Sequence, residues 1–153
     1  MREISVSELN LNPIDKIGKE WMLCTAGGAG NYNTMTCSWG HLGCLWNLPT
    51  AVCYVRPQRY TKQFIDREEL YTLTFFPKEF HDKLMYLGSH SGRDEDKVAK
   101  TELTPVFGEG YTCIRGLLND GSVNMEGKTV LSFMLDTAWM VPIFFLLVLV
   151  LKV

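Results

Sequence analysis

The sequence predicts a mainly β, antiparallel domain, a barrel or a sandwich with helical insertions. Short segments rich in β-branched and aromatic residues recur through the first two thirds of the chain. Helical patterns separate only some of these segments, whereas a doubly wound sheet needs a helix after nearly every strand. The 153 residues favour one domain, 1–153, and 46% hydrophobic residues are enough to build its core.

Four segments have the pattern of strands: 21–25, 34–39, 50–56 and 70–76. The glycine-rich stretch 27–30 is expected to end the first strand in a loop. Gly40 and Gly43 are expected to open a loop after the second strand, and Pro57 ends the third because proline cannot continue a ladder. Between 102 and 114 only short strands are expected.

Helices are predicted in three places. Segment 59–67 carries apolar residues four apart on one face. A second helix begins near Pro77, which suits a first helical turn, and ends at Gly88. A short third helix would run from Asp94, as its N-cap, through Val98.

Composition excludes several classes of function. The net charge of −2 gives no general attraction to nucleic acid or to an anionic membrane. The five cysteines form no C-x-x-C and the three histidines are scattered, so no metal site is expected. Reduced, mostly buried cysteines are typical of a cytoplasmic protein. The acidic N-terminus without an apolar run does not resemble a signal peptide.

The C-terminal end is unusual because all 14 residues from 138 to 151 are apolar. A membrane-spanning helix needs roughly 20 such residues, and Pro142 interrupts this run. Three interpretations stay open: a core strand, a peripheral membrane anchor, or a non-native end.

The second predicted strand carries three hydroxyls on one face, Thr34, Thr36 and Ser38. One interpretation is a solvent-exposed face, as antiparallel sheets often have. The other is a row of donors for the polar edge of a heteroaromatic ring, with Asn33 and Trp39 beside it. Cys37 falls on the opposite, apolar face, where burial would raise the pKa of its thiol and leave it inert.

Segment 56–61 joins a strand end to a helix start. The first turn of a helix offers unpaired N–H groups and the positive end of the helix dipole, so it attracts anions. Arg56 and Arg59 add guanidinium groups whose geometry matches phosphate oxygens. Plain surface charge is the alternative.

Segment 89–94 is the third candidate. Gly92 permits a close backbone approach, and His90 could donate a hydrogen bond or move a proton near neutral pH. The alternative is a loop that only caps helices. The chain contains neither G-x-S-x-G nor G-x-G-x-x-G, which argues against a hydrolase triad and a dinucleotide fold.

Segments 33–46, 55–61 and 89–94 resemble, in this order, the flavin reductase-like family of FMN-binding split barrels. Lys97 and segment 101–107 extend the resemblance, which covers about residues 17–114. It implies an antiparallel split β-barrel that binds FMN, forms a homodimer and transfers hydride from NADH or NADPH to flavin. The alternative within the family is an FMN-binding electron carrier, similar to flavoredoxin, without nicotinamide activity of its own.

The resemblance also assigns residues. The strand from Asn33 would lie along the flavin, the junction from Arg56 would hold the phosphate, and the loop from His90 would close over the cofactor. The implied FMN-binding residues are Asn33, Thr34, Met35, Thr36, Ser38, Trp39, Arg56, Gln58, Arg59, Tyr60, Thr61, His90, Ser91, Gly92 and Arg93. No catalytic residue is implied, and His90 is the only candidate.

The resemblance does not extend over residues 116–153. This part is either an altered end that does not complete the barrel or a pair of strands, 129–135 and 143–151, that seals it, since both segments are rich in β-forming residues.

Overall fold

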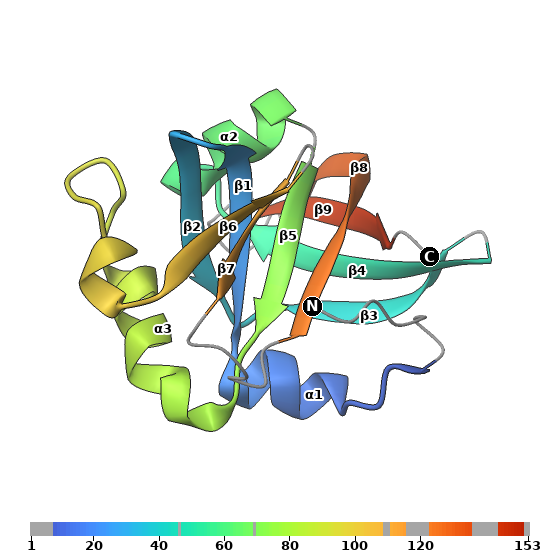
Figure 1. Cartoon of the computed structure of the whole chain (residues 1–153). Coiled ribbons are helices and arrows are strands. Elements are labelled where there is room, and N and C mark those ends of the chain that lie inside the picture. Colours follow the sequence, from blue (N-terminus) through green and yellow to red (C-terminus); the bar gives the residue numbers. More distant parts are fainter. Residues whose placement is uncertain are drawn as a thin grey trace.

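The computed structural model describes residues 8–45, 47–68, 70–108, 111–115, 123–135 and 144–151. Its main feature is a seven-stranded antiparallel sheet of order β2-β1-β5-β8-β9-β4-β3 (Figure 1). The strands of this sheet are β1 (Met22–Gly28), β2 (Asn31–Cys37), β3 (Gly40–Leu45), β4 (Leu48–Val55), β5 (Leu70–Phe75), β8 (Val123–Leu135) and β9 (Phe144–Leu151). A hairpin of β6 (Thr104–Gly108) and β7 (Tyr111–Arg115) lies against β1 and β5. The expectation of a mainly antiparallel β fold is confirmed.

The sheet curves but does not close within the described residues, because β2 and β3 stand at its two ends. These two strands follow one another in the chain and are joined only through residues 38 and 39. A hydrogen bond from Tyr54 N to Trp39 O (3.2 Å) ties this crossing to β4. The connection therefore brings the end of β2 close to the end of β4.

Within the described residues, three α-helices and three 3-10 or π-helical turns accompany the sheet. The α-helices are α1 (Pro13–Asp15), α2 (Tyr60–Glu68) and α3 (His81–Ser89). A π-helical turn, Lys16–Glu20, continues α1, and 3-10 turns occupy Lys78–Phe80 and Ala99–Thr101. α2 packs on β1 and β2, and α3 packs on β2 (Figure 1). The predicted helix 59–67 matches α2 within one residue.

Two local predictions are wrong. Gly40 opens strand β3 instead of a loop, because its missing side chain permits a close approach: a Cβ there would lie 2.2 Å from Val52 O. The expected helix from Asp94 through Val98 is absent among the described residues, and turns lead instead to the 3-10 turn that begins at Ala99. The Asp94 N–H bonds Ser91 O (3.1 Å), which fixes a turn and not a helix start.

The β1–β2 hairpin extends further than the glycines suggest. β1 continues through Gly28, which pairs with Asn31 across a turn at residues 29 and 30. Gly27 has a φ of 102°, and a Cβ there would lie 2.3 Å from Asn31 O. Glycine is therefore needed at position 27 for the strand to bend and does not end it.

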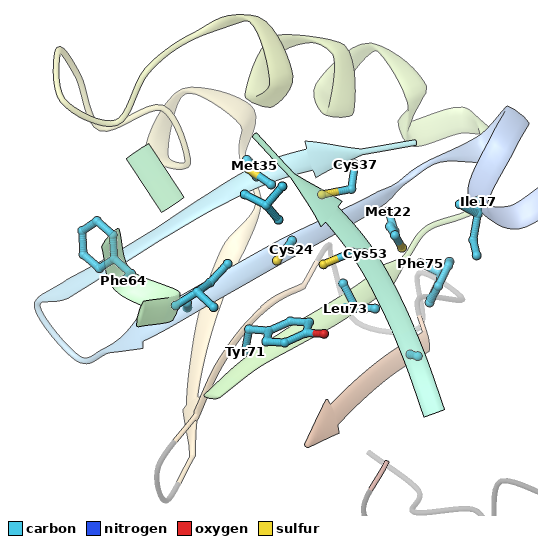
Figure 2. Packing of buried hydrophobic residues seen from close by; sticks show 14 residues of the cluster. Ile17, Met22, Cys24, Met35, Cys37, Cys53, Phe64, Tyr71, Leu73 and Phe75 are labelled. Carbon is cyan, nitrogen blue, oxygen red and sulfur yellow. The ribbon is translucent and has the colours of Figure 1, made fainter. Parts of the chain in front are cut away.

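Strand β1 is buried on both faces and separates two apolar clusters. Met22 and Cys24 point into the concave side of the sheet, where they meet β4 and β5 (Figure 2). Leu23 points to the other side and packs with Leu84 and Leu87 of α3. On the neighbouring β2, Thr34 is fully buried and Thr36 is half-buried, so the hydroxyl-bearing face is not a solvent-exposed face.

The last two described strands lie inside the sheet. β8 pairs with β5, and β9 pairs with β8 and with β4. Of the apolar run 138–151, residues 144–151 form β9, and residues 138–143 lie outside the described residues. In the described part of the chain, no helix is long and apolar enough to cross a membrane. The N-terminal residues 1–7, to which the signal-peptide prediction applies, also lie outside the described part.

Candidate functional site

A pocket of about 180 Å³ opens where β2 ends and crosses to β3. Its lining comes from β2 and the crossing, from the end of β4, and from the loop before α2. The lining residues are Met35, Thr36, Cys37, Ser38, Trp39, Tyr54, Arg56 and Arg59. The structure thus brings two of the three predicted segments, the hydroxyl-bearing strand and the arginine junction, to one cavity.

The hydroxyls of β2 have unequal surroundings. The Thr34 hydroxyl is fully buried and hydrogen-bonded to the Thr25 hydroxyl of β1 (2.8 Å). The Thr36 hydroxyl donates to Leu84 O of α3 (2.5 Å), although Thr36 also lines the pocket. Ser38 is half-buried and lines the pocket. Only the far end of the strand therefore presents its polar groups to a ligand.

The junction before α2 places guanidinium groups at the pocket wall. Arg59 Nη1 donates to Gly88 O (3.1 Å), the penultimate residue of α3. Burial and the charge of Arg56 both lower the pKa of Arg59, which shows that the two cations are close and partly desolvated. Among the described residues, no carboxylate forms an ion pair with Arg56 or Arg59. Two adjacent cations at a helix start, without a described carboxylate between them, form a site that attracts an anion.

Lys97 holds the end of α3 from the other side. Only 4% of its surface is exposed, and its ammonium donates to Leu87 O (2.7 Å) and His90 O (2.9 Å). Burial, followed by the charge of Arg59, lowers its pKa to about 8. Lys97 and Arg59 thus bind three carbonyl oxygens around the last turn of α3, a position where cations are favourable.

The third predicted segment, residues 89–94, lies against Asn33 of β2, whose side chain in turn contacts the start of α2. The Asn33 amide donates to the Thr61 hydroxyl (2.8 Å), and a Cβ on Gly92 would lie 2.1 Å from Asn33 Oδ1. The guanidinium of Arg93 lies 4.8 Å from the centre of the Tyr60 ring. The loop after α3 therefore rests on β2 and on the first turn of α2, next to the arginine junction.

Nine of the fifteen predicted residues do not line the pocket: Asn33, Thr34, Gln58, Tyr60, Thr61, His90, Ser91, Gly92 and Arg93. His90 stacks on Tyr86 (3.9 Å between ring centres), and its Nδ1 lies 3.1 Å from Tyr86 O. Ser91 Oγ accepts a hydrogen bond from Arg93 N (3.2 Å) within the loop. Gln58 is exposed in the turn after β4. His90 is thus held by the last turn of α3, Ser91 by its own loop, and Arg93 lies on the Tyr60 ring.

The expectation for Cys37 is confirmed for its burial in the apolar core and is wrong for the direction of its pKa shift. Its pKa is lowered, because the thiols of Cys24 and Cys53 donate hydrogen bonds to its sulfur and Arg59 adds positive charge nearby. The pKa of Cys24 is raised, mainly because its thiol is a donor to the sulfurs of Cys37 and Cys53. Residue alternation placed Cys37 correctly in the core but said nothing about the neighbouring thiols.

Sequence reasoning missed Tyr54 as a lining residue. Tyr54 and Arg56 are two residues apart, so strand alternation places them on one face, and this was the signal available. It also missed that the α3 carbonyls complete the surroundings of Arg59. No side-chain pattern reports a carbonyl acceptor, so that contact could not be found from sequence. Among the described residues, no group of acidic, histidine and cysteine side chains forms a metal site.

The pocket is too small to enclose a whole nucleotide cofactor. Pockets that enclose drug-sized ligands measure roughly 300–1,000 Å³, which is more than this cavity offers. The hydroxyl of Ser38 and the ring of Tyr54 suit the edge of a heteroaromatic ring, while Arg56 and Arg59 suit a phosphate. Trp39, 57% exposed at the rim, leaves the far side of the site open.

Comparison with known proteins gives a consistent result for the fold. No family model and no curated protein matches the chain. Solved structures do match. A flavoredoxin from Methanosarcina acetivorans has a TM-score of 0.70 at 19% identity, covering 100% of this chain and 74% of the other. An FMN-binding protein from Thermus thermophilus, solved with bound p-hydroxybenzaldehyde, has a TM-score of 0.70 at 17% identity, with 100% and 80% coverage.

A third match is the FMN-binding domain of a flavin reductases-like enzyme from Shewanella baltica. Its TM-score is 0.66 at 13% identity, covering 91% of this chain and 70% of the other. At such low identities the likeness concerns the backbone, and it agrees with the resemblance carried by the three ordered segments. This chain has the fold of the flavin reductase-like, FMN-binding split-barrel proteins.

Proposed function

We propose that the protein binds FMN and transfers hydride from NADH or NADPH to flavin. One observation carries the proposal: Arg56 and Arg59 stand unpaired by any described carboxylate at the start of α2, beside a pocket that presents ring-compatible groups. Two partly desolvated cations close together repel each other, so a site of this kind is stabilised by an anionic ligand. The FMN phosphate and ring together match both halves of the site.

Different residues of this chain would bind the phosphate and the ring of FMN. Arg56 and Arg59 bind the phosphate, and Ser38 and Tyr54 contact the ring edge. The loop carrying Gly92 and Arg93 covers the phosphate side, because it already rests on Asn33 and Tyr60. Bound FMN supplies the hydride chemistry itself, so the protein needs to orient the ring and exclude water, without an acid–base pair.

A second candidate is an FMN-binding electron carrier without nicotinamide activity. The observation that favours it is the likeness to flavoredoxins from two organisms, Methanosarcina acetivorans and Desulfovibrio vulgaris. The described pocket is the same in both cases, since both functions need the same FMN contacts. The difference lies in whether a nicotinamide reaches the flavin.

FMN binding is tested first, and the reaction of the bound flavin with NADH or NADPH is tested second. FMN is titrated into the purified chain while flavin fluorescence is followed, and saturable quenching is expected. Anaerobic stopped-flow mixing of the complex with NADH or NADPH then gives bleaching of the flavin absorbance for a reductase. An electron carrier stays yellow until a partner reductase is added. A chain that folds but does not take up FMN contradicts both functions.

We also propose that this single domain works as a homodimer in the cytoplasm. Trp39, exposed at the pocket rim, offers apolar surface that a second copy would cover, next to a pocket too small to enclose FMN. The described free cysteines suit a reducing compartment. Sedimentation velocity tests the dimer, and Trp39→Ala should shift the chain towards monomer. A monomer at micromolar concentration that binds FMN normally would contradict it.

A further inference from the structure

The carbonyl groups of α3 are bound by side chains from three other segments of the chain. The Thr36 hydroxyl of β2 donates to Leu84 O (2.5 Å). Arg59 Nη1, from the junction before α2, donates to Gly88 O (3.1 Å). The ammonium of Lys97 binds two further carbonyl oxygens at the end of the helix. The position of this helix end relative to β2 is therefore fixed by several contacts, two of which come from residues that line the pocket.

Gly88 is a place where α3 has no room for a side chain against β2. A Cβ at Gly88 would lie 3.0 Å from Thr36 Cβ and 3.4 Å from Thr36 Oγ1. Carbon atoms are attracted best at about 3.5–4.0 Å, so the first contact would be repulsive. Thr36 Cβ is bonded directly to the backbone of β2, where Thr36 pairs with Leu23 of β1, so it cannot turn aside. A side chain at Gly88 would thus shift α3 away from β2 by a few tenths of an ångström.

Backbone conformation does not explain the glycine at this position. Among the described glycines, Gly27 and Gly30 have positive φ values, whereas Gly88 lies within α3 and has none. Inside a helix, glycine is also a poorer residue than alanine, because it loses more backbone entropy on folding. The feature that requires glycine is therefore the close packing of α3 on Thr36.

The same residue holds the arginine at the pocket wall. Thr36, which Gly88 packs against, and Arg59, which its carbonyl binds, both line the pocket. The N–H groups of a guanidinium form a rigid planar fork, so the bond from Nη1 to Gly88 O fixes the direction of the other donors. A shift of α3 away from β2 would move this carbonyl and would turn the guanidinium with it.

We propose that Gly88 is a positioning residue for phosphate recognition and that it contributes to selectivity for FMN over riboflavin. By allowing α3 to pack closely on β2, it places the Arg59 guanidinium where the phosphate binds. The inference rests on the proposed FMN-binding function. Riboflavin has the ring and the ribityl chain of FMN but no phosphate, so the ratio of the two affinities reports phosphate recognition separately from ring binding.

The test compares the affinities of FMN and riboflavin for the full-length Gly88→Ala variant, measured by quenching of flavin fluorescence. FMN affinity should fall by roughly 3- to 10-fold, which is part of the roughly 10- to 150-fold loss expected when the Arg59 guanidinium is removed. Riboflavin affinity should stay at the wild-type value. Equal losses for both flavins, or an unchanged FMN affinity, would overturn the proposal.

The matched control is Gly18→Ala. Gly18 also lies in a helical turn, Lys16–Glu20, but nothing lies within 4 Å of a Cβ there. This variant makes the same chemical change without a contact to β2, and both flavin affinities should stay at the wild-type values. A selective loss of FMN affinity in Gly18→Ala as well would show that the effect does not come from the packing of Gly88 on Thr36.

A double-mutant cycle distinguishes positioning from a general loosening of the fold. If Gly88 acts through Arg59, the Gly88→Ala substitution in an Arg59→Ala background should cause no further loss of FMN affinity. A purely structural role would persist without the guanidinium. A further loss in that background would therefore overturn the proposal.

Thr36→Ala is the second variant if circular dichroism shows that Gly88→Ala does not fold. It removes the hydroxyl that donates to Leu84 O and adds no bulk, so the end of α3 is held less firmly on β2. Any contact of Thr36 with the flavin ring is common to both ligands and cancels in the ratio. The ratio of FMN to riboflavin affinity should fall, and an unchanged ratio would contradict the positioning role.

The wild-type chain tests the proposed function separately. Tighter binding of FMN than of riboflavin supports a phosphate site at Arg59. Equal affinity for the two flavins, or binding of neither, would contradict that site and the positioning role with it. A wild-type chain and a Gly88→Ala variant that prefer FMN to the same degree would overturn the positioning role alone and leave the phosphate site standing.

Discussion

The hydroxyl-bearing strand β2 and the arginine junction before α2 are both candidate ligand-binding segments in the sequence, but in the structure their polar side chains differ in whether they have partners within the protein. The Thr34 hydroxyl is hydrogen-bonded to the Thr25 hydroxyl, and the Thr36 hydroxyl donates to a carbonyl of α3. Arg56 and Arg59 meet no described carboxylate and adjoin an open cavity. A polar residue on a buried strand must find a partner, and only the structure shows whether that partner is the protein or a ligand.

The largest effect is expected from Arg59→Ala, which removes a charged contact to the FMN phosphate. One charge-assisted hydrogen bond contributes about 1.5–3 kcal/mol, which corresponds to a loss of roughly 10- to 150-fold in FMN affinity. Fluorescence titration measures it. The matched control is Arg67→Ala, because Arg67 lies at the other end of α2 and contacts Glu68 (2.6 Å). Equal affinity for both variants would remove Arg59 from the phosphate site.

Thr34→Val should give the complementary result, a loss of stability without a loss of FMN affinity. The substitution keeps the shape but leaves the buried Thr25 hydroxyl without its partner at 2.8 Å, at a cost of about 1–3 kcal/mol. Urea unfolding measures this cost. The double variant Thr25→Val/Thr34→Val should recover most of it, because both polar groups are then gone. A drop in FMN affinity for Thr34→Val at intact fold would show that β2 binds the ligand along its whole length.

The Gly92→Ala variant tests whether the loop after α3 contributes to FMN binding in addition to Arg56 and Arg59. The added Cβ would meet Asn33 Oδ1 at 2.1 Å, so either the loop or the Asn33 side chain must shift, with a cost of about 1–3 kcal/mol. FMN affinity should fall modestly, because Arg93 loses its place over Tyr60. Gly43→Ala is the control, since nothing lies within 4 Å of a Cβ there. Unchanged affinity and stability for Gly92→Ala would mean that the loop is not held against Asn33.

The sequence predicted those parts of the fold and site that depend on local pattern. Residue alternation located β2 and β5, the four-residue spacing located α2, and the strand-to-helix junction located Arg59. It did not locate β3, because a glycine required for close packing at Val52 looks the same as a glycine that ends a strand.

The missed contacts depend on the three-dimensional path of the chain. The carbonyl cluster held by Arg59 and Lys97 and the thiol cluster around Cys37 both join segments far apart in the sequence. No single segment contains the signal for either of them. The resemblance brought the three site segments together as one ligand site, but it could not say that Thr34 is used inside the sheet.

Titration of Lys97 carries the smallest expected effect on FMN affinity, and its sign differs for stability and for binding. In the folded chain its pKa is lowered to about 8 from 10.5, by burial first and by the charge of Arg59 second, while Glu95 opposes the shift. Between these two pH values the unfolded chain binds more protons, so the free energy of unfolding rises with pH. The burial penalty of the ammonium is thus present below about pH 8 and is removed as the pH rises towards 10.5.

FMN affinity should change in the opposite direction, because the neutral amine no longer adds to the positive field of Arg59. We expect affinity to weaken as the pH passes about 8, by less than the Arg59→Ala effect. Titrations on both sides of this pH measure it, with urea unfolding in the same buffers. The Lys97→Gln variant keeps a donor for the α3 carbonyls but cannot titrate, so both trends should flatten. Parallel trends of stability and affinity in the wild type would mean that Lys97 acts only through the loop position and not through its charge.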